Sequence, residues 1–297
     1  MKLVTLTVFT PTYNRAELLK RGYEALCRQT LKDFCWLIID DGSTDNTKDI
    51  VESWIKENII PITYIYKENG GLHTGYNKAI EVMNTEICVC IDSDDYMPDE
   101  AVEIIVNSWK KYNNGKVSGM VGYDQTTDGM RLGGPMNEGE IIHYVQLKSN
   151  RKYQADNKIV MRVDLLKSVA PQPSFYGEKN FNPIWMILKI DQLKPFVLID
   201  KTLCIVNYQE NGMAANIINQ YFNSPNSFIE LRKLYISLKY TSISWKLRHQ
   251  IHLIAESLIA KKSVLSVSPN KSVSVLMFPF GLMLYCYLLI KHNQQNR

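Results

Sequence analysis

Three aspartates follow a short apolar run in the first third of the chain, where their carboxylates could bind a cation. Asp92, Asp94 and Asp95 come directly after Ile87–Ile91. Their mutual repulsion costs free energy unless a positive charge offsets it. Carboxylate oxygens suit hard cations such as Mg²⁺ or Mn²⁺, which in turn bridge the oxygens of a diphosphate. The cluster therefore predicts a metal site, with a turn and helix cap before Pro98 as the alternative.

A second pair of acids, Asp40 and Asp41, precedes Gly42 at the end of another apolar run. A carboxylate at this place could accept a hydrogen bond from the N–H of a nucleotide base. The alternative is a turn, in which aspartate and glycine serve only the backbone.

The elements that must position these acids alternate between apolar strands and amphipathic helices. Strands that are nearly all apolar are buried on both faces, which is typical of a parallel sheet flanked by helices. Polar clusters follow four of the predicted strands, and ligands of open α/β sheets bind at the carboxyl ends of strands. The predicted strands are Leu3–Phe9, Phe34–Ile39, Ile62–Tyr66, Ile87–Ile91 and Val117–Tyr123, and the helices between them are Arg15–Gln29, Thr44–Glu57, Thr74–Met83 and Pro98–Tyr112.

The second half of the chain carries fewer signals. Helical patterning resumes near Asp164–Val169 and Asn182–Lys189, and Phe196–Ile199 and Thr202–Tyr208 are predicted as two late strands. Long basic helices are expected after Asn226. We therefore predict a catalytic domain over 1–225, with halves 1–123 and 124–225, and a helical tail over 226–297.

Charge is unevenly distributed along the 297 residues, whose formal net charge is +4. This value is too small for a dedicated nucleic-acid binder, so no nucleic-acid partner is expected. Residues 228–297 carry ten Lys or Arg against two acids, which directs the tail toward an anionic surface. The six cysteines form no C-x-x-C pair, and reduced thiols in a cytoplasmic setting are expected.

Four segments, taken together, resemble the family-2 glycosyltransferases of the GT-A fold. They are Phe9–Arg15, Asp40–Asp45, Asn69–Asn77 and Ile91–Asp95. The resemblance is strong over about residues 1–123 and looser to about residue 219. It implies an α/β fold with a mostly parallel central sheet flanked by helices, followed here by a helical basic C-terminal tail. The tail is similar to the membrane-proximal ends of bacterial polysaccharide-building members.

The resemblance also implies roles for individual residues. Asp41 would recognise the base, most often uracil, Asp92 would bond the ribose, and Asp94 would ligate the Mn²⁺ or Mg²⁺ that bridges the diphosphate. The remaining residues expected around the donor nucleotide are Thr10, Pro11, Tyr13, Lys67, His73 and Asn77.

An inverting transfer needs a carboxylate that removes the proton from the attacking hydroxyl. By its place in the family pattern, Glu178 is the predicted catalytic base, although many relatives have a Glu-Asp pair where this chain has Lys179. Asp156, Asp164 and Asp191 are the alternatives. A loop over Tyr208–Asn216 resembles the one that closes over the donor in this family.

The tail contains the apolar run Val273–Ile290, with Pro279 and Gly281 in its middle. These two residues are expected to break or kink a helix, which favours a re-entrant or interfacial segment over a clean span. A packed hairpin is the soluble alternative. His249 and His252 are expected on the surface.

The predicted function is an inverting, metal-dependent glycosyltransferase on the cytoplasmic face of a bacterial inner membrane. It would move a sugar from a nucleotide-sugar donor, expected to be a UDP-sugar, to a hydroxyl of a lipid-linked oligosaccharide. Such a step belongs to capsule, exopolysaccharide or O-antigen synthesis. Two alternatives are a sugar-nucleotidyltransferase, which would show a glycine-rich loop near the N-terminus, and a non-catalytic, membrane-bound sugar-binding protein.

Overall fold

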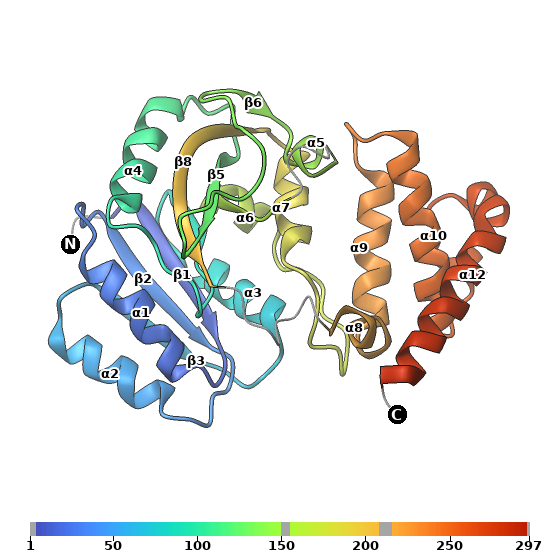
Figure 1. Cartoon of the computed structure of the whole chain (residues 1–297), viewed down its shortest axis with the longest axis horizontal. Helices are drawn as coiled ribbons and strands as arrows, with labels where there is room; N and C mark the ends of the chain where they lie inside the picture. Colours follow the sequence, from blue (N-terminus) through green and yellow to red (C-terminus); the bar gives the residue numbers. More distant parts are fainter. Residues whose placement is uncertain (1–3, 150–154, 208–215, 296–297) are drawn as a thin grey trace. The chain divides into compact units, whose positions relative to one another are not determined.

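The structure of the protein is a computed structural model that describes residues 4–149, 155–207 and 216–295 (Figure 1). The chain divides into two compact units. The first comprises residues 1–70, 74–171 and 186–207, and the second comprises residues 71–73, 172–185 and 208–297. The segment 172–185, which includes Glu178, thus belongs with the C-terminal helices.

The first unit is built on an eight-stranded sheet with the order β3-β2-β1-β4-β7-β5-β8-β6. The first four strands in this order run parallel, whereas β7 is antiparallel to both of its neighbours. The strands are β1 (Leu6–Thr12), β2 (Phe34–Asp40), β3 (Ile62–Tyr66), β4 (Ile87–Cys90), β5 (Gly119–Thr126), β6 (Ile141–Ile142), β7 (Asn157–Arg162) and β8 (Phe196–Val206). The mixed sheet flanked by helices confirms the predicted α/β GT-A fold.

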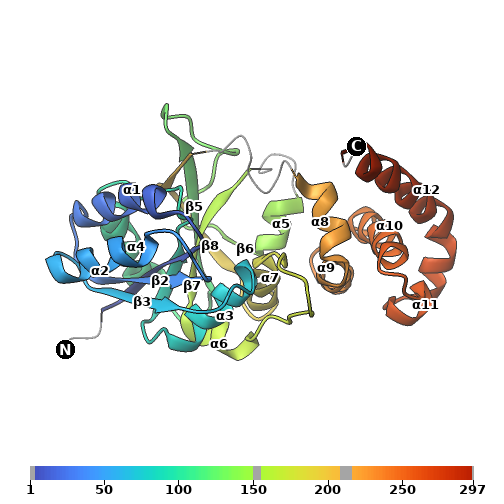
Figure 2. The same cartoon turned by 90° about the horizontal axis from the view of Figure 1, so that it is seen from below.

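Helices cover both faces of this sheet. The helices α1 (Ala16–Cys27), α2 (Thr47–Glu57) and α4 (Ala101–Tyr112) lie on one face, and α3 (Leu72–Val82) and α6 (Val163–Val169) lie on the other (Figure 2). The short α5 (Tyr144–Ser149) and α7 (Ile184–Asp191) complete the set. The strands β1, β2 and β4 are almost wholly buried because both faces are covered, as their apolar sequences require.

The core beneath α1 and α2 contains an aromatic stack of Tyr23, Trp36 and Trp54. The rings of Tyr23 and Trp54 lie 4.4 Å apart, and those of Trp36 and Trp54 lie 5.8 Å apart. The indole N–H of Trp36 donates to Thr10 Oγ1 at 3.0 Å, so the polar edge of the buried ring is satisfied. This packing fixes the end of β1, from which the candidate site is built.

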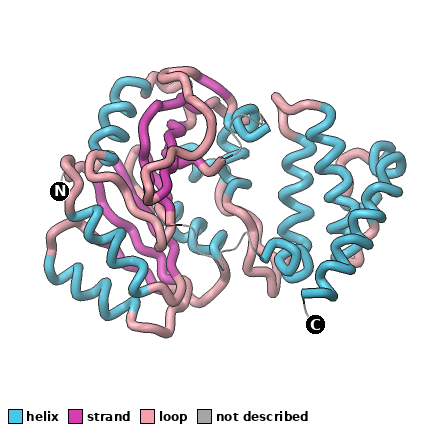
Figure 3. The backbone as a smooth tube through the Cα atoms, viewed as in Figure 1, coloured by secondary structure: helices cyan, strands magenta, loops and turns pink. Residues whose placement is uncertain are grey.

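Within the second unit, residues 216–295 are mostly helical, whereas residues 172–183 form turns and loop (Figure 3). Its helices are α8 (Ile217–Asn223), α9 (Pro225–Ser237), α10 (Ile243–Ile259), α11 (Val264–Val267) and α12 (Lys271–Gln295), with α10 packed between α9 and α12. Ser274, Gly281 and Leu288 form the buried strip of α12, seven residues apart. A Cβ at Gly281 would lie 2.4 Å from Ile254 Cγ2, so glycine permits this close helix–helix approach.

Three local predictions were wrong. The helix α12 runs without interruption through Pro279 and Gly281, because the glycine serves a contact with α10 rather than a bend. The two late strands are one strand, β8, which bulges at its pairing with β5. His249 is 6% exposed rather than on the surface, and both His249 and His252 face Arg232.

Candidate functional site

The polar clusters identified in the sequence meet at one edge of the sheet. In the parallel register Thr12 pairs with Asp40, Asp40 with Tyr66, and Phe9 with Cys90. The carboxyl ends of β1, β2, β3 and β4 therefore lie side by side, and the segments that follow them form a common rim. Ligands of open α/β sheets bind at such an edge.

Asp41 is held at this rim by a lysine and a backbone amide. Its Oδ1 accepts hydrogen bonds from Lys67 Nζ at 2.5 Å and from the N–H of Gly70 at 3.0 Å. Lys67 Nζ also donates to Thr74 Oγ1 at 2.8 Å. The carboxylate is 6% exposed, so the pair forms a fixed, nearly buried anchor that joins the ends of β2 and β3. Two residues predicted in the donor pocket, Asp41 and Lys67, are thus in direct contact.

The predicted residues after β1 occupy different environments. Thr10 is 2% exposed and accepts the hydrogen bond from Trp36, so its side chain belongs to the core. Pro11 is buried, whereas Tyr13 is 48% exposed at the rim. Of the three, Tyr13 has the side chain that a ligand could reach directly.

His73 and Asn77 both belong to α3, but they are assigned to different compact units. Asn77 belongs to the first unit, where it lines an open hollow of about 520 Å³ together with Lys67, Thr74 and Lys167. His73 belongs to the second unit, where it is fully buried and its ring lies 6.1 Å from that of Phe181.

The three aspartates after β4 have different exposures. Asp92 is exposed, Asp94 has a side chain that is 17% exposed, and Asp95 is buried. Arg15, which immediately precedes α1, pairs with Asp94 Oδ2 at 3.1 Å through Nη1. The same nitrogen donates to Ser93 Oγ at 3.2 Å.

Asp95 is part of a buried charge cluster that the sequence analysis did not predict. Lys158 Nζ on β7 lies 3.9 Å from Asp95 Oδ2 and 3.9 Å from Asp124 Oδ1 on β5. Burial raises the pKa of Asp95 to about 7 and that of Asp124 to about 6, while the ammonium group of Lys158 opposes both shifts. Asp95 Oδ1 also accepts a hydrogen bond from the N–H of Asn207 at 3.1 Å. Asp95 therefore acts as a structural support behind the two more accessible acids.

The residues at the end of β4 fit a hard divalent cation by their chemistry. Asp92 and Asp94 present carboxylate oxygens at the rim, which Mg²⁺ and Mn²⁺ prefer. Across the described residues, however, no group of three or more His, Cys, Asp or Glu side chains is arranged to hold an ion. Further ligands for the cation must therefore come from water or from a bound molecule such as a diphosphate.

Glu178 lies in the second unit, where its carboxylate binds the first turn of α9. Its Oε1 accepts hydrogen bonds from Asn226 N at 2.9 Å and Nδ2 at 2.6 Å, and its Oε2 accepts from Ser227 N and Oγ, both at 2.7 Å. The side chain is 7% exposed. A carboxylate at a helix N-terminus is stabilised by the unpaired amides and by the helix dipole. A role as general base would require these contacts to open, and it stays a prediction.

The alternative acids have identifiable partners as well. Asp191 is fully buried and accepts from the N–H of Tyr144 at 2.7 Å at the start of α5. Asp164 binds Arg162, whose Nε lies 2.9 Å from its Oδ1. Asp156 is exposed. The predicted donor-covering loop falls largely on residues 208–215, outside the described residues.

Arg15 and Lys158 are the residues whose contacts the sequence analysis missed. Arg15 stands inside the first of the four quoted segments, but its type alone does not reveal a partner about 80 positions away. Lys158 directly precedes the apolar residues Ile159–Met161, so its charge stands at the start of an apolar run. An isolated lysine in a buried strand signals a buried acid, and this signal was lost because no strand was predicted there.

Comparison with known proteins gives the same assignment along the chain. The sequence model of Glycosyl transferase family 2 matches residues 7–169. The chondroitin synthase of Pasteurella multocida is 29% identical over 110 residues, which is 37% of this chain but 11% of that much longer protein. The chain therefore spans only a small part of such curated relatives.

Solved structures extend the likeness in fold to nearly the whole chain. Staphylococcus aureus TarS residues 1–349, in complex with UDP-GlcNAc, has a TM-score of 0.59 at 15% identity and covers 98% of this chain and 92% of that one. The mannosyltransferase PcManGT of Pyrobaculum calidifontis, with GDP-Man and Mn²⁺, has a TM-score of 0.55 at 16% identity and covers 99% and 84%. Since the family match covers more than half of the residues and contains the whole acidic rim, the chain belongs to glycosyl transferase family 2.

Proposed function

We propose that the protein is an inverting, metal-dependent glycosyltransferase that moves a sugar from a UDP-sugar to a hydroxyl of a lipid-linked oligosaccharide. One observation carries the proposal: the Asp41–Lys67 pair and the accessible acids Asp92 and Asp94 lie on the same edge of the sheet. The first pair suits a base and the second suits the ribose and the diphosphate. A nucleotide could thus lie along the rim with its phosphates toward β4.

In this proposal each donor residue has a distinct task. Asp41, oriented by Lys67, accepts a hydrogen bond from the uracil, and Tyr13 offers its exposed ring beside the base. Asp92 bonds the ribose, and Asp94 holds the Mn²⁺ or Mg²⁺. The cation, when bound, neutralises charge on the diphosphate as the sugar leaves. Thr10, Pro11 and Asn77 support the pocket rather than contact the reacting atoms.

The general base in the proposal remains Glu178, with Asp156, Asp164 and Asp191 as alternatives. Its four hydrogen bonds to α9 make it a carboxylate with two possible roles, a proton acceptor and a helix anchor. The Glu178→Gln variant separates these roles. Loss of the proton acceptor would lower turnover, whereas loss of the helix anchor would lower stability.

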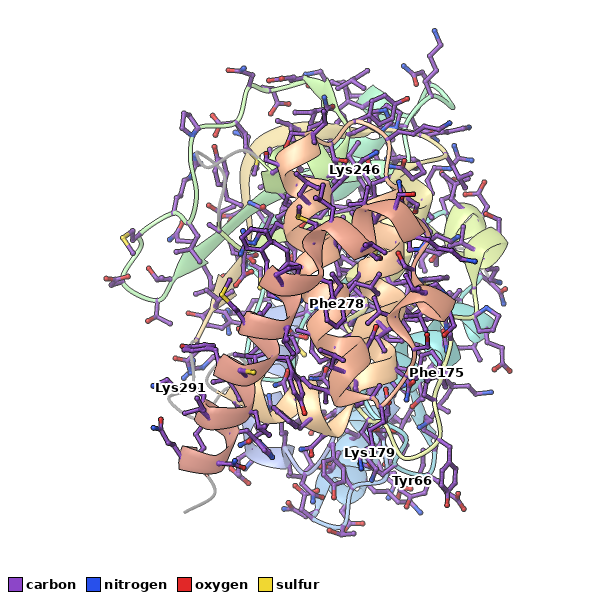
Figure 4. All side chains as sticks on the ribbon, turned by 90° about the vertical axis from the view of Figure 1, so that its right-hand side faces the viewer. Tyr66, Phe175, Lys179, Lys246, Phe278 and Lys291 are labelled. Atoms are coloured by element: carbon purple, nitrogen blue, oxygen red, sulfur yellow. The ribbon has the colours of Figure 1, made fainter. Side chains whose placement is uncertain are left out.

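The proposed place of action is the cytoplasmic face of a bacterial inner membrane. Among the described residues one helix, Lys271–Gln295, is long and apolar enough to cross a membrane, which by itself is weak support. Only 17% of its most apolar 18-residue stretch is buried. Figure 4 looks onto this helix, with Phe278 near its middle and Lys291 near its C-terminal end. The exposed lysines Lys261, Lys262 and Lys271 lie at or before its start, where they would meet anionic headgroups.

A binding screen tests the donor part of the proposal. Thermal unfolding of the detergent-purified protein is measured with UDP-, GDP- and dTDP-sugars, each with Mn²⁺ and with EDTA. We expect stabilisation by UDP-sugars in Mn²⁺ that corresponds to about 2.7 kcal/mol at a concentration 100 times the dissociation constant. Asp41→Asn should abolish the preference for uracil, and Asp49→Asn, an exposed acid on α2, is the matched control. Stabilisation by GDP-sugars alone would contradict the assignment of the base, and none by any nucleotide would contradict the function.

A further inference from the structure

Arg15 connects the end of β1 to the acids after β4. Its Nη1 contacts Asp94 Oδ2 at 3.1 Å and Ser93 Oγ at 3.2 Å. The residue precedes the first turn of α1, and its carbonyl oxygen accepts the N–H groups of Leu18 and Leu19. The guanidinium is therefore carried by a fixed backbone, while 39% of its side chain is exposed to solvent.

The two cations near the acids occupy different positions. Lys158 is 8% exposed and lies between Asp95 and Asp124, so its charge is committed to the interior. Arg15 lies on the solvent side and pairs with the acid predicted to hold the metal. The guanidinium therefore contacts a carboxylate oxygen that a divalent cation would need.

A cation that arrives alone would find few ligands. Asp94 is paired with Arg15, Asp95 is buried beside Lys158, and the described residues hold no ready group of three acidic, histidine or cysteine ligands. A diphosphate changes both conditions, because it offers oxygens to the cation and a better partner to Arg15. Guanidinium groups bind phosphate through paired, charge-assisted hydrogen bonds.

We propose that Arg15 exchanges partners, from Asp94 in the ligand-free protein to the donor diphosphate in the loaded one, and thereby makes cation and diphosphate binding mutually dependent. The inference rests on the proposed function, since it assigns a positioning role within the same donor site. When Arg15 leaves Asp94, the carboxylate becomes available to the cation. By thermodynamic linkage, the factor by which the diphosphate strengthens cation binding equals the factor by which the cation strengthens diphosphate binding.

The test measures Mn²⁺ affinity without any turnover. Free Mn²⁺ is quantified by electron paramagnetic resonance in titrations of the full-length protein, with and without saturating UDP. Wild type should bind Mn²⁺ weakly alone and more tightly with UDP. Arg15→Gln should bind Mn²⁺ alone about tenfold more tightly, because a nearby positive charge and a competitor for Asp94 are both removed. It should bind UDP in EDTA about tenfold or more weakly, because a charge-assisted hydrogen bond is lost.

Two matched variants complete the experiment. Lys20→Gln removes the same charge from α1, where Lys20 pairs with the exposed Glu17, and should leave both affinities unchanged. Arg15→Lys keeps the charge without the planar fork and should fall between wild type and Arg15→Gln. Unchanged or weaker Mn²⁺ binding by Arg15→Gln would overturn the partner exchange. If wild type itself fails to bind UDP with Mn²⁺, the proposed function fails instead, so the two failures are distinguishable.

Discussion

At the scale of single residues, Glu178 has two candidate roles, as the general base and as an anchor for the start of α9. Its four hydrogen bonds reach both the backbone and the side chains of Asn226 and Ser227 at the start of α9. These contacts would stabilise the start of α9 without any catalytic role. A carboxylate that is also the base must satisfy both demands.

The Glu178→Gln variant separates these demands. If Glu178 is the base, turnover should fall by about 10²–10⁴ while UDP affinity stays nearly intact. As a helix anchor, the same change should lower the free energy of unfolding by about 1–3 kcal/mol, because an amide group replaces an acceptor in front of N–H donors. Stability is measured by chemical unfolding, and turnover by nucleotide release.

Glu140→Gln is the matched control, since Glu140 is a partly exposed acid in the first unit. A stability loss with full turnover would remove Glu178 from the reaction and leave it as an anchor. Unchanged stability would contradict the anchor role.

The polar residues at the rim could be predicted from the sequence, whereas the buried charge cluster around Lys158 could not. Asp41, Asp92 and Asp94 could be singled out because acids at strand ends form a local pattern, and Lys67 followed from the family resemblance; the structure brings Asp41 and Lys67 into contact. Lys158 could not, because Asp95 lies in the loop after β4 and Asp124 lies on β5, and only the antiparallel insertion of β7 brings Lys158 between them.

At the scale of elements, α9 and α10 enclose a buried charge network in the second unit. Arg232 Nε donates to Glu256 Oε1 at 3.0 Å, and its Nη1 lies 3.1 Å from His249 Nδ1. Its Nη2 lies 3.5 Å from His252 Nδ1. Because the guanidinium donates to these ring nitrogens, both histidines are neutral in this arrangement.

This network predicts a loss of stability in acid. Burial, followed by the nearby Arg232, lowers the pKa of His249 to about 2 and that of His252 to about 3. Below pH 6.5 the unfolded chain binds protons that the folded chain does not, so stability present above pH 6.5 is lost as the pH falls. Each histidine contributes a loss of about 1.4 kcal/mol per pH unit in this range.

Glu256 acts in the opposite direction. Burial raises its pKa to about 7 against the pairing with Arg232, so its contribution to stability is present at low pH and is lost as the pH rises toward 7. Between pH 6.5 and 4.5, the stability that Glu256 gains offsets about the loss that one of the two histidines causes. Chemical unfolding followed by circular dichroism at pH 7 and pH 5.5 should show a smaller acid loss for His249→Gln than for wild type. Equal losses in the two proteins would mean that His249 is protonated in the fold.

From β1 to β5, the helices and strands of the first unit follow from the hydrophobic pattern to within three residues of their ends, whereas β7 was not predicted. The strand Ile62–Tyr66 was predicted with its observed bounds, and α12 occupies the expected apolar run. The predicted break at Pro279 failed because the helix gains packing against α10 through Gly281, which a local rule does not include. The short α5 and β6 have too few residues for a periodic signal.

At the scale of the whole molecule, the surface of α12 bears on whether the protein is attached to a membrane. Exposed apolar residues cover most of its surface, among them Leu276 at 68% and Met283 at 61%. Only the strip that faces α10 is buried. This exposure supports the proposal that α12 meets lipid.

The double variant Leu276→Asp and Met283→Asp tests this proposal without disturbing the contact with α10. An aspartate at the centre of a membrane helix, as at position 283, costs about 2.5–3.5 kcal/mol, and one nearer the helix end, as at position 276, costs less. Wild type should need detergent for extraction from membranes. The variant should be released in part by high salt alone, because only its basic residues would still hold it.

The control is Asn293→Asp, an exposed position near the end of α12 that should extract like wild type. If wild-type protein is released from membranes by buffer alone, the exposed face of α12 is covered by something other than lipid, and the membrane assignment is wrong.

In the proposed function, the acidic rim and a divalent cation together activate a nucleotide sugar. The most direct measurement is the release of UDP from UDP-sugars by purified protein, followed with Mn²⁺, with EDTA and in Asp94→Asn. We expect slow hydrolysis in Mn²⁺ that is abolished by EDTA and by Asp94→Asn, and unchanged in Asp49→Asn, an exposed acid on α2 that has no role in the proposed site. Full hydrolysis in EDTA or by Asp94→Asn would contradict the proposed function.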